Sequence, residues 1–381
     1  MNTLTAFYDL PKEWEVVRLL DITHIFDGTH QTPQYTHHGV AFFSVENIAN
    51  NKPNKFISQQ DYLIATSKNK PEYNDILLTR IGAIGISKVV SWTYPFSIYV
   101  TLAVIKQSKY FNSYYLHYFI QSSFFQKELK DNSLLQAIPC KINMDKLKKC
   151  KVILPPLNEQ SAIANILSAL DRYLYALDAL ILKKEGVKKA LSFELLSQRK
   201  RLKGFNQAWQ RVRLGDIANY LTSNLSVEQI TQQGKIKVYD VNNFIGYTDT
   251  TFISDKPYIS IVKDGSVGRV RILPPKTNIL STMGALIANH RTTTEFLFYL
   301  LSNFDFKNFT SGSIIPHIYF KDYKEKTIFL PPLNEQSTIA NILSALDNEI
   351  ASLKNKKRQF ENIKKALNHD LMSAKIRVLK K

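Results

Sequence analysis

Along the chain, short β-like runs alternate with stretches of helical spacing, in an order that occurs twice. Apolar runs bounded by glycine and polar residues predict strand-turn-strand segments at 76–90 and 258–273. Each is followed by a stretch with helical spacing, at 113–129 and 294–304. The pattern predicts the α+β class, with two globular domains of mixed strands and helices.

A longer helical pattern begins after each Leu-Pro-Pro sequence, at 154–156 and 330–332. The prolines can stop a preceding strand, and Asn158 and Asn334 are placed to cap a helix whose first turn holds an acidic residue. Neither helical segment contains an internal proline. We expect two long helices, the first from about 158 to 198, which at 1.5 Å per residue is about 60 Å long.

Apolar residues in both long helices recur in alternating steps of four and three, a period typical of a coiled coil. The expected seam residues are Leu170, Leu174, Leu177, Ile181, Leu191 and Leu195, and Leu346, Ile350, Leu353, Phe360, Leu367 and Leu371. Lys184, Lys188, Lys357 and Lys364 fill the other seam positions, where we expect them to weaken the pairing. Because the connector to the next domain is short, the helices should run antiparallel. The alternative is two amphipathic helices that each pack on their own domain.

An internal repeat organises the whole chain. The sequence LPPLNEQSAIANILSALD at 154–171 recurs at 330–347, where Thr338 in place of Ala162 is the only difference. A fainter echo pairs WEVVRLLDI, which starts at Trp14, with WQRVRLGDI, which starts at Trp209. The chain is therefore two copies of one unit, related by a pseudo-two-fold axis.

The repeat predicts four segments: a first domain at 1–153, a helical segment at 154–203, a second domain at 204–329 and a helical segment at 330–381. The helical segments are nearly identical where they begin, whereas the domains differ in length and sequence. This contrast indicates a common requirement at the helices and different tasks for the two domains.

The formal net charge of +18 favours a polyanionic partner, because Lys and Arg release the counterions condensed on such a partner. The positive excess is spread along the chain, without a basic tail. Cys140 and Cys150 lie far from the spacing of a zinc site, and a disulfide framework is not indicated. The start, with Asp9 and Glu13, has no apolar core, so we expect neither a signal peptide nor a membrane span, and a cytoplasmic location.

Two Gly-rich turns are candidate anion sites. Gly82 and Gly85 lie between Arg80 and Lys88 in the first domain, and Gly265 and Gly268 occupy the same place in the second, beside Lys263, Arg269 and Arg271. Such a turn can bring backbone N–H groups and cations close to phosphate. A plain hairpin turn with solvated cations is the alternative, and both interpretations stay open.

The sequence predicts no catalytic or metal site in this chain. It contains no GxxxxGK[ST] loop for ATP, no [DN]PP[YF] string of amino-methyltransferases and no HExxH. His30, His37 and His38 lie in the segment DGTHQTPQYTHHG, where a metal site is conceivable. Without cysteine or a helical HxxxH spacing, a polar surface loop is the better interpretation.

With two LPPLNEQ motifs, each opening an Ile/Leu-rich helix after a separate domain, the chain resembles the specificity subunits of type I restriction-modification systems. The strings WQRVRLGDI, DGTHQTPQY and GSVGRV add to the resemblance, which covers the full chain. It implies two target-recognition domains, each reading one half of a bipartite, asymmetric site in double-stranded DNA, separated by an antiparallel two-helix spacer. It also implies a non-catalytic chain without a cofactor of its own.

The partners implied by the resemblance are two adenine methyltransferase subunits, which bind S-adenosylmethionine, and restriction subunits that translocate and cut DNA with ATP and Mg²⁺. The residues expected to dock the methyltransferases are Leu154, Pro155, Pro156, Asn158, Glu159 and Gln160, and Leu330, Pro331, Pro332, Asn334, Glu335 and Gln336. The residues expected to contact DNA are Gln31, Gln34, Arg80, Lys88, Lys263, Ser266, Arg269, Arg271 and His317.

The length of the predicted rod, about 60 Å, corresponds to roughly 18 base pairs, and domains that overhang inward shorten the span. Since grooves face the same side every 10 to 10.5 base pairs or so, we expect half-site centres about one turn apart. Two alternatives remain at this point. One is a two-headed protein-protein scaffold whose charge is incidental, and the other is a stand-alone nuclease.

Overall fold

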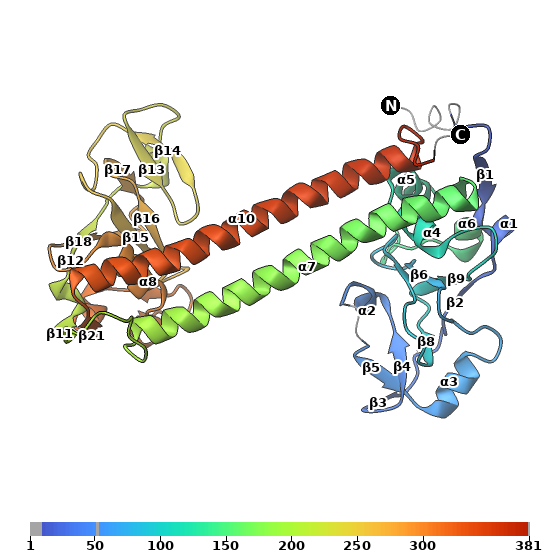
Figure 1. Cartoon of the computed structure of the whole chain (residues 1–381), viewed down its shortest axis with the longest axis horizontal. Helices are drawn as coiled ribbons and strands as arrows, with labels where there is room; N and C mark the ends of the chain where they lie inside the picture. Colours follow the sequence, from blue (N-terminus) through green and yellow to red (C-terminus); the bar gives the residue numbers. More distant parts are fainter. Residues whose placement is uncertain (1–9, 51–52, 380–381) are drawn as a thin grey trace. The chain divides into compact units, whose positions relative to one another are not determined.

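The computed structural model describes residues 10–50 and 53–379, so Asp9 lies outside the described residues. The chain divides into two compact units, residues 1–177 with 356–381 (unit 1) and residues 178–355 (unit 2). Each unit contains one mixed domain and part of both long helices (Figure 1). The unit boundaries cut through the long helices, and the division into four segments stays a prediction. No helix in the described part of the chain is both long and apolar enough to cross a membrane.

Unit 1 contains two four-stranded sheets and one two-stranded sheet. The first sheet, ordered β2-β9-β6-β7, is antiparallel and consists of Ile25–Asp27, Leu102–Ile105, Ile76–Thr79 and Ser87–Val89. The second, ordered β3-β5-β4-β8, consists of Tyr35–Thr36, Lys55–Ile57, Val40–Phe43 and Phe96–Ile98, with β4 and β8 parallel. β1 (Glu15–Arg18) pairs with β10 (Lys151–Leu154). The short helices are α1 (Leu19–Ile22), α2 (Val45–Asn50), α3 (Gln59–Ala65), α4 (Ser113–Ile120), α5 (Ser123–Asp131) and α6 (Met144–Lys149).

Unit 2 repeats this plan. Its four-stranded antiparallel sheet, ordered β12-β18-β15-β16, consists of Ala218–Thr222, Met283–Ala288, Tyr258–Val262 and Val270–Leu273. A three-stranded sheet, ordered β14-β13-β17, consists of Phe244–Thr248, Ile236–Tyr239 and Thr277–Ile279, and again one strand pair is parallel. β11 (Gln210–Arg213) pairs with β21 (Thr327–Leu330), and β19 (Thr310–Ser311) with β20 (His317–Ile318). Helices α8 (Thr294–Ser302) and α9 (Phe320–Tyr323) and three 3₁₀ turns, Leu214–Asp216, Val227–Gln229 and Lys307–Phe309, complete the unit.

The two long helices, α7 (Leu157–Leu196) and α10 (Leu333–Met372), each contain 40 residues. The prediction that Asn158 and Asn334 cap them was wrong by two positions. Each helix already begins at the residue before the asparagine, and each asparagine side chain accepts a hydrogen bond from the next backbone N–H, at 2.9 and 2.8 Å. The carbonyl of Pro156 accepts the N–H groups of Glu159 and Gln160, so the proline itself starts the helix.

The two helices pack together, as the 3.5-residue period predicts, and they run antiparallel, as the short connector predicts. The expected seam residues are buried or half-buried, whereas most of the residues between them are exposed; among the seam positions, Leu177, Ile181, Leu195, Ile350 and Leu371 are fully buried. In unit 1 the ring of Tyr173 lies 4.6 Å from that of Phe360. Burial of side chains of this size contributes about 1.5–3 kcal/mol each.

Three of the seam lysines, which we expected to weaken the pairing, form ion pairs across the seam. Lys188 Nζ lies 2.5 Å from Asp347 Oδ1, and Lys184 Nζ lies 2.8 Å from Glu349. Lys364 forms the equivalent pair with Asp171 at 2.5 Å. Residue numbers on α10 decrease as those on α7 increase from one ion pair to the next, so these contacts also fix the antiparallel register.

A tyrosine from each domain bonds to the carboxylate of two of these pairs, those of Asp171 and Asp347. Tyr118 donates to the second oxygen of Asp171 at 2.7 Å, and Tyr299 donates to Asp347 at 2.8 Å. Burial raises the pKa of both tyrosines, and the neighbouring carboxylate adds to the shift. Each phenol therefore stays protonated and fastens a helix of its domain to the two long helices.

A buried carboxylate at the start of each long helix forms the second repeated contact. Trp14 Nε1 donates to Glu159 at 3.1 Å, and the guanidinium of Arg377, past the end of α10, donates to both oxygens of Glu159 at 2.7 and 3.0 Å. In unit 2, Trp209 donates to Glu335 at 3.0 Å, and Arg201, past the end of α7, lies 2.7 Å from the same carboxylate.

These contacts predict that removing one buried carboxylate destabilises unit 2. Glu335→Ala leaves Trp209 Nε1 without its acceptor and Arg201 without its counter-charge, and we expect it to lower the free energy of unfolding by about 2–4 kcal/mol. Glu349→Ala is the matched control, because its ion pair is half-exposed, with side-chain exposures of 30% for Lys184 and 45% for Glu349, and contributes about 1 kcal/mol or less. Urea unfolding followed by circular dichroism measures both. Equal stability of the two variants would contradict the importance of this contact.

Candidate nucleic-acid interface

Each unit contains a turn with two glycines in the left-handed region of the backbone. Gly82 and Gly85, between β6 and β7, have φ of +83° and +93°, and Gly265 and Gly268, between β15 and β16, have φ of +84° and +79°. A side chain on Gly82 or Gly265 would meet no atom within 4 Å, so these positions face open space. Glycine is thus required there by the backbone angle and not by crowding.

The two turns are equivalent in their hydrogen bonds as well as in their sequence position. Gly85 N–H donates to Thr79 O, and Gly268 N–H donates to Val262 O, at 3.0 and 2.9 Å. The first N–H of each turn, on Gly82 or Gly265, is also used, because it donates to a carbonyl of a neighbouring hairpin. These bonds favour a tight hairpin over an open cradle of free N–H groups.

Two arginines of unit 2 converge beside the second turn. Arg269 donates to the side chain of Asn242 and Arg271 donates to its backbone carbonyl, both at 3.0 Å. Arg271 also lies over the ring of Tyr239, 5.2 Å from its centre. In the described part of the chain, neither guanidinium is within ion-pair distance of a carboxylate. The pair is therefore a local positive site, with Arg269 exposed and Arg271 half-buried.

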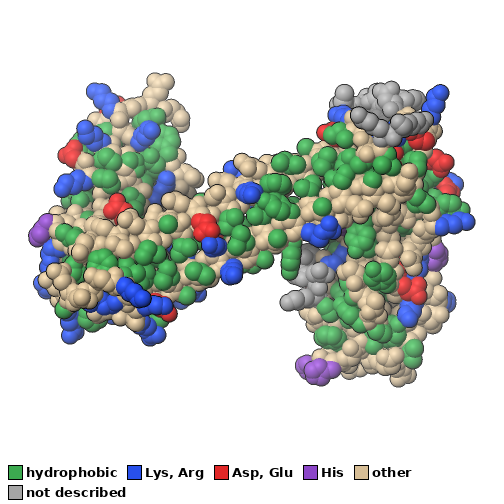
Figure 2. Space-filling view, in the orientation of Figure 1, with side chains coloured by type: hydrophobic (Ala, Val, Ile, Leu, Met, Phe, Trp, Pro, Cys, Tyr) green, Lys and Arg blue, Asp and Glu red, His purple; other side chains and the backbone are tan. Residues whose placement is uncertain are grey.

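The other expected contact residues of unit 2 lie on or beside the same turn. Ser266 is exposed at the tip, and Lys263 is half-buried where β15 ends. His317, on β20, lies 2.7 Å from Asp264, the residue before Gly265. This pair holds β20 against the turn. Figure 2 shows Lys and Arg side chains spread over the visible surface, in accord with the even charge along the sequence.

Arg80 of unit 1 does not face solvent, although it occupies the position equivalent to Lys263. The residue is only 6% exposed, and its guanidinium donates to the carbonyl of Val100 at 2.8 Å and to Asp27 at 3.3 Å. Burial lowers its pKa, and the charge of Asp27 opposes that shift. Arg80 is thus buried next to the first turn and held by these two contacts, and its expected contact with DNA stays a prediction.

The loop that begins at Asp27 carries Gln31 and Gln34, and both glutamines are exposed. Asp27 binds Arg80 and lies 3.0 Å from His30 Nε2, so this loop is tied to the base of the first turn. Among residues 10–50 and 53–379, no cluster of His, Cys, Asp and Glu could hold a metal ion.

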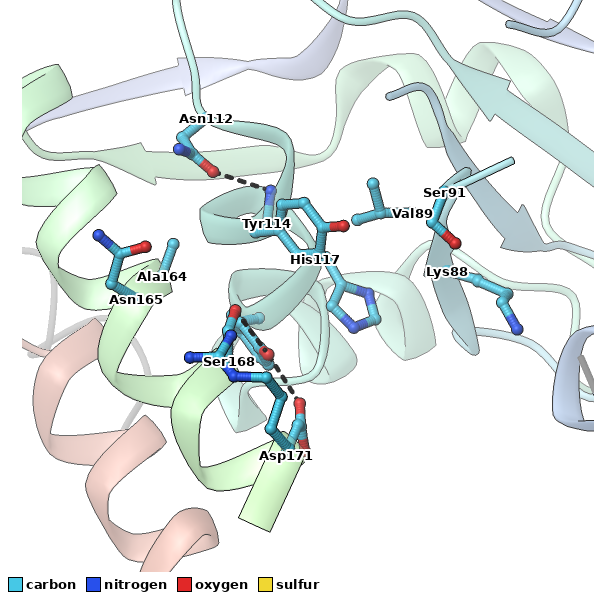
Figure 3. Close-up of a pocket in the computed structure, with 12 residues that line it drawn as sticks. Lys88, Val89, Ser91, Asn112, Tyr114, His117, Ala164, Asn165, Ser168 and Asp171 are labelled. Atoms are coloured by element: carbon cyan, nitrogen blue, oxygen red, sulfur yellow. Dashed lines mark hydrogen bonds between the residues drawn. The ribbon is translucent and has the colours of Figure 1, made fainter. Parts of the chain in front are cut away.

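Lys88 is one of the residues that line a cavity of about 590 Å³ between β7, α4 and α7 (Figure 3). Burial lowers its pKa, and its Nζ lies 6.0 Å from the centre of the Trp92 ring. His117 lines the same cavity, and burial together with the charge of Lys364 lowers the pKa of this histidine to about 4. The imidazole is therefore neutral at pH 7, and Lys88 and the nearby Arg172 are the cations of this cavity.

The residues expected to dock a partner fall into two groups. Buried positions are Leu154, Pro155, Glu159 and Gln160, and Leu330, Pro331, Glu335 and Gln336. Each glutamine bridges its own domain and helix: Gln160 accepts from Asn112 N–H at 2.8 Å, and Gln336 accepts from Thr293 N–H at 3.0 Å. Exposed or half-exposed positions are Pro156, Asn158, Pro332 and Asn334. Part of the repeated motif is thus explained by contacts within the chain.

Several residues that organise the site were missed from the sequence. The repeat does contain a signal for Arg201 and Arg377, which occupy the same place relative to Leu157 and Leu333. Tyr118 and Tyr299 also stand at the same place, two residues after Leu116 and Leu297, but the signal is weaker because aromatic residues are frequent in both predicted helices. Cys140 and Cys150 are both unpaired, and burial raises the pKa of the Cys150 thiol to about 12.

A family model described as "Type I restriction modification DNA specificity domain" matches residues 11–184 and, a second time, residues 206–362. The MjaVIII specificity subunit of a type I restriction enzyme from Methanocaldococcus jannaschii is 23% identical, with 97% of this chain and 94% of that protein covered. A second protein of that organism, described as the "Putative type I restriction enzyme MjaX specificity subunit", is 27% identical. The match covers 98% of this chain and 96% of that protein.

Solved structures show the same fold over nearly the full length. The type I restriction-modification S subunit from M. genitalium has a TM-score of 0.63 at 18% identity, with 95% of this chain and 97% of that chain covered. HsdS from Thermoanaerobacter tengcongensis has a TM-score of 0.50 at 16% identity, with 97% and 99% covered. Because the family model matches both repeats and most of the sequence, this chain belongs to the family of type I restriction-modification DNA specificity subunits.

Proposed function

We propose that residues 1–153 and 204–329 are target-recognition domains that each read one half of a bipartite, asymmetric site in double-stranded DNA. The observation that carries the proposal is the family model, which matches twice in one chain. Membership of this family makes the chain the non-catalytic, DNA-recognising subunit of its enzyme. The asymmetry follows from the domains, since equivalent positions such as Arg80 and Lys263 differ in both residue and exposure.

The start of each long helix docks one methyltransferase subunit. Within the repeated motif, contacts inside the chain account for the buried residues but not for Leu157 and Leu333, which are 49% and 47% exposed. Asn158 and Asn334 are exposed as well. Two nearly identical exposed surfaces fit two copies of one partner better than two different partners. S-adenosylmethionine then belongs to these partners, and ATP and Mg²⁺ belong to the restriction subunits.

The contact residues on the two domains divide by chemistry. Gln31, Gln34 and Ser266 are exposed, uncharged donors and acceptors suited to base edges. Arg269, Arg271 and Lys263 supply charge suited to phosphate beside the second turn. Lys88 and His317 are half-buried and support these surfaces from behind. Arg80 is left out because it is buried.

The proposal predicts that the DNA sequence read by the chain can be changed one half at a time. The chain is co-expressed with its methyltransferase subunit in a cell that lacks the system, and adenine methylation is mapped across the genome. We expect a new motif with two specific halves, separated by a gap that gives half-site centres about one turn apart. Exchange of residues 1–153 for those of a related subunit changes one half, and exchange of 204–329 changes the other.

A motif without a gap, or one that changes throughout after a single exchange, would contradict the assignment of one half to each domain. Absence of any motif from a stable complex would instead favour a two-headed scaffold without DNA specificity.

The arginine pair of unit 2 predicts a measurable electrostatic effect. Arg269→Gln with Arg271→Gln removes two cations that form no ion pair with a carboxylate among the described residues. We expect weaker binding of the full chain to a random-sequence duplex and a log-log salt slope that is smaller by about 0.9 for each phosphate that is no longer neutralised. Fluorescence anisotropy at several salt concentrations measures the slope.

Arg213→Gln is the matched control, because Arg213 is already paired with Asp216 and Glu325 at 3.3 and 3.1 Å. We expect its salt slope to stay close to that of the unmodified chain. If the double variant and this control have the same slope, the arginine pair does not contact phosphate.

A further inference from the structure

In both domains a second hairpin pairs with the Gly-rich turn, and the two hairpins occupy equivalent positions. In unit 1, Leu134 pairs with Lys141, and Lys141 pairs in turn with Ile81 of the first turn. In unit 2, Ser311 pairs with His317, and His317 pairs with Asp264 of the second turn. We call residues 134–141 and 311–317 the support hairpins.

The base of each support hairpin is firmly held by backbone hydrogen bonds. Gly82 N–H donates to Cys140 O at 2.8 Å, and Ile142 N–H donates to Arg80 O at 2.9 Å. The equivalent bonds in unit 2 join Gly265 to Pro316 and Ile318 to Lys263, both at 2.9 Å. The tip of each hairpin is therefore presented from a fixed base.

An isoleucine at each tip is almost completely exposed. Ile138 has a relative exposure of 101%, and Ile314, two residues before the anchored Pro316, has 92%. Ile138 stands two residues before the anchored Cys140, so the two isoleucines occupy the same place. With such exposure, packing against the described part of the chain does not account for an apolar residue at either tip. Burial of such a side chain in a complex is strongly favourable.

The neighbours of the two isoleucines are also apolar and exposed. Leu134 and Leu135 are each 49% exposed, and Ile315 is 55% exposed. Residues 134–140 and 311–316 contain no charged side chain. Gln136, Ser311 and Ser313 are donors that suit phosphate, whereas the isoleucines at the tips suit bases, because thymine methyl groups and the base stack are apolar themselves.

Cations lie at the base of each support hairpin and not at its tip. Lys141 lies at the base of the first, and Lys263 is bonded to the base of the second. This arrangement fits duplex DNA as the occupant, with charged groups toward the phosphates and apolar groups toward the bases. A protein partner would match these cations only if its surface carried carboxylates at the corresponding places.

We propose that Ile138 and Ile314 are apolar base-contacting residues, one for each half of the DNA site. The proposal rests on the proposed function, since it places each isoleucine against the half-site that its own domain reads. The two isoleucines could not be chosen as DNA contacts by their hydrogen-bonding groups, because their side chains have none. We assign them to contacts with particular bases and not to the electrostatic attraction between the chain and DNA.

The test uses the full chain in complex with its methyltransferase subunits and a duplex that carries the mapped methylation motif. Fluorescence anisotropy gives the Kd for the unmodified chain, Ile138→Ala and Ile314→Ala. We expect each variant to bind this duplex about tenfold more weakly, with an unchanged salt slope, because no charge is removed. We also measure two duplexes in which one half-site is scrambled.

The scrambled duplexes assign each isoleucine to a half-site. On the duplex that lacks the half read by domain 1, Ile138→Ala should bind as the unmodified chain does, while Ile314→Ala should still be weaker. Ile363→Ala and Leu182→Ala are the matched controls, since these aliphatic side chains are 50% and 69% exposed on the long helices. We expect the controls to leave the Kd unchanged.

Three results would overturn the proposal. The first is a Kd for both variants within twofold of the controls, and the second is an equal weakening on intact and scrambled duplexes. The third is dissociation of the methyltransferase from the complex, which would assign the tips to a protein interface. If the unmodified complex does not distinguish the mapped duplex from the scrambled ones, the proposed function itself fails, and the role of the isoleucines fails with it.

Discussion

The architecture depends on a carboxylate buried in the first turn of each long helix. Glu159 and Glu335 are 2% and 0% exposed, and a carboxylate in such a place is tolerated only when hydrogen bonds and counter-charge replace its water. Both replacements come from distant segments, a tryptophan that begins the domain and an arginine past the end of the other long helix. One interaction therefore joins three segments in each unit, and it sets where each helix starts relative to its domain.

The long helices were largely predictable from the sequence, and the contacts that fasten them were not. An apolar period and a repeated motif are properties of the linear sequence, so seam positions and the α+β class follow from it. The role of a seam lysine depends on which residue stands opposite, and that is known only once the antiparallel register is known. Lys188 and Lys364 were therefore expected to weaken a seam in which they form ion pairs with Asp347 and Asp171.

The candidate DNA surface shows the same limit more strongly. The two Gly-rich turns were placed correctly because glycine spacing marks them, but the residues beside them were ranked by chemical type alone. Arg80 and Lys263 stand at equivalent positions, yet only Arg80 is buried, because Asp27 and the Val100 carbonyl approach it from other parts of domain 1. The sequence around Arg80 gives no indication of these two contacts, because Asp27 and Val100 are distant from it along the chain.

Whether a repeated residue is evidence for a partner depends on whether it is buried within the chain. Glu159 and Gln160 recur in the second copy, but their contacts inside the chain are sufficient reason, so their recurrence alone is no argument for docking. The opposite holds for Ile138 and Ile314, which the fold leaves unconstrained. An exposed isoleucine at the same place in two otherwise different domains is not explained by packing within the described chain. We propose that the explanation is a contact shared by the two domains outside the chain, and the cations at the base of each support hairpin favour DNA over the methyltransferase as that partner.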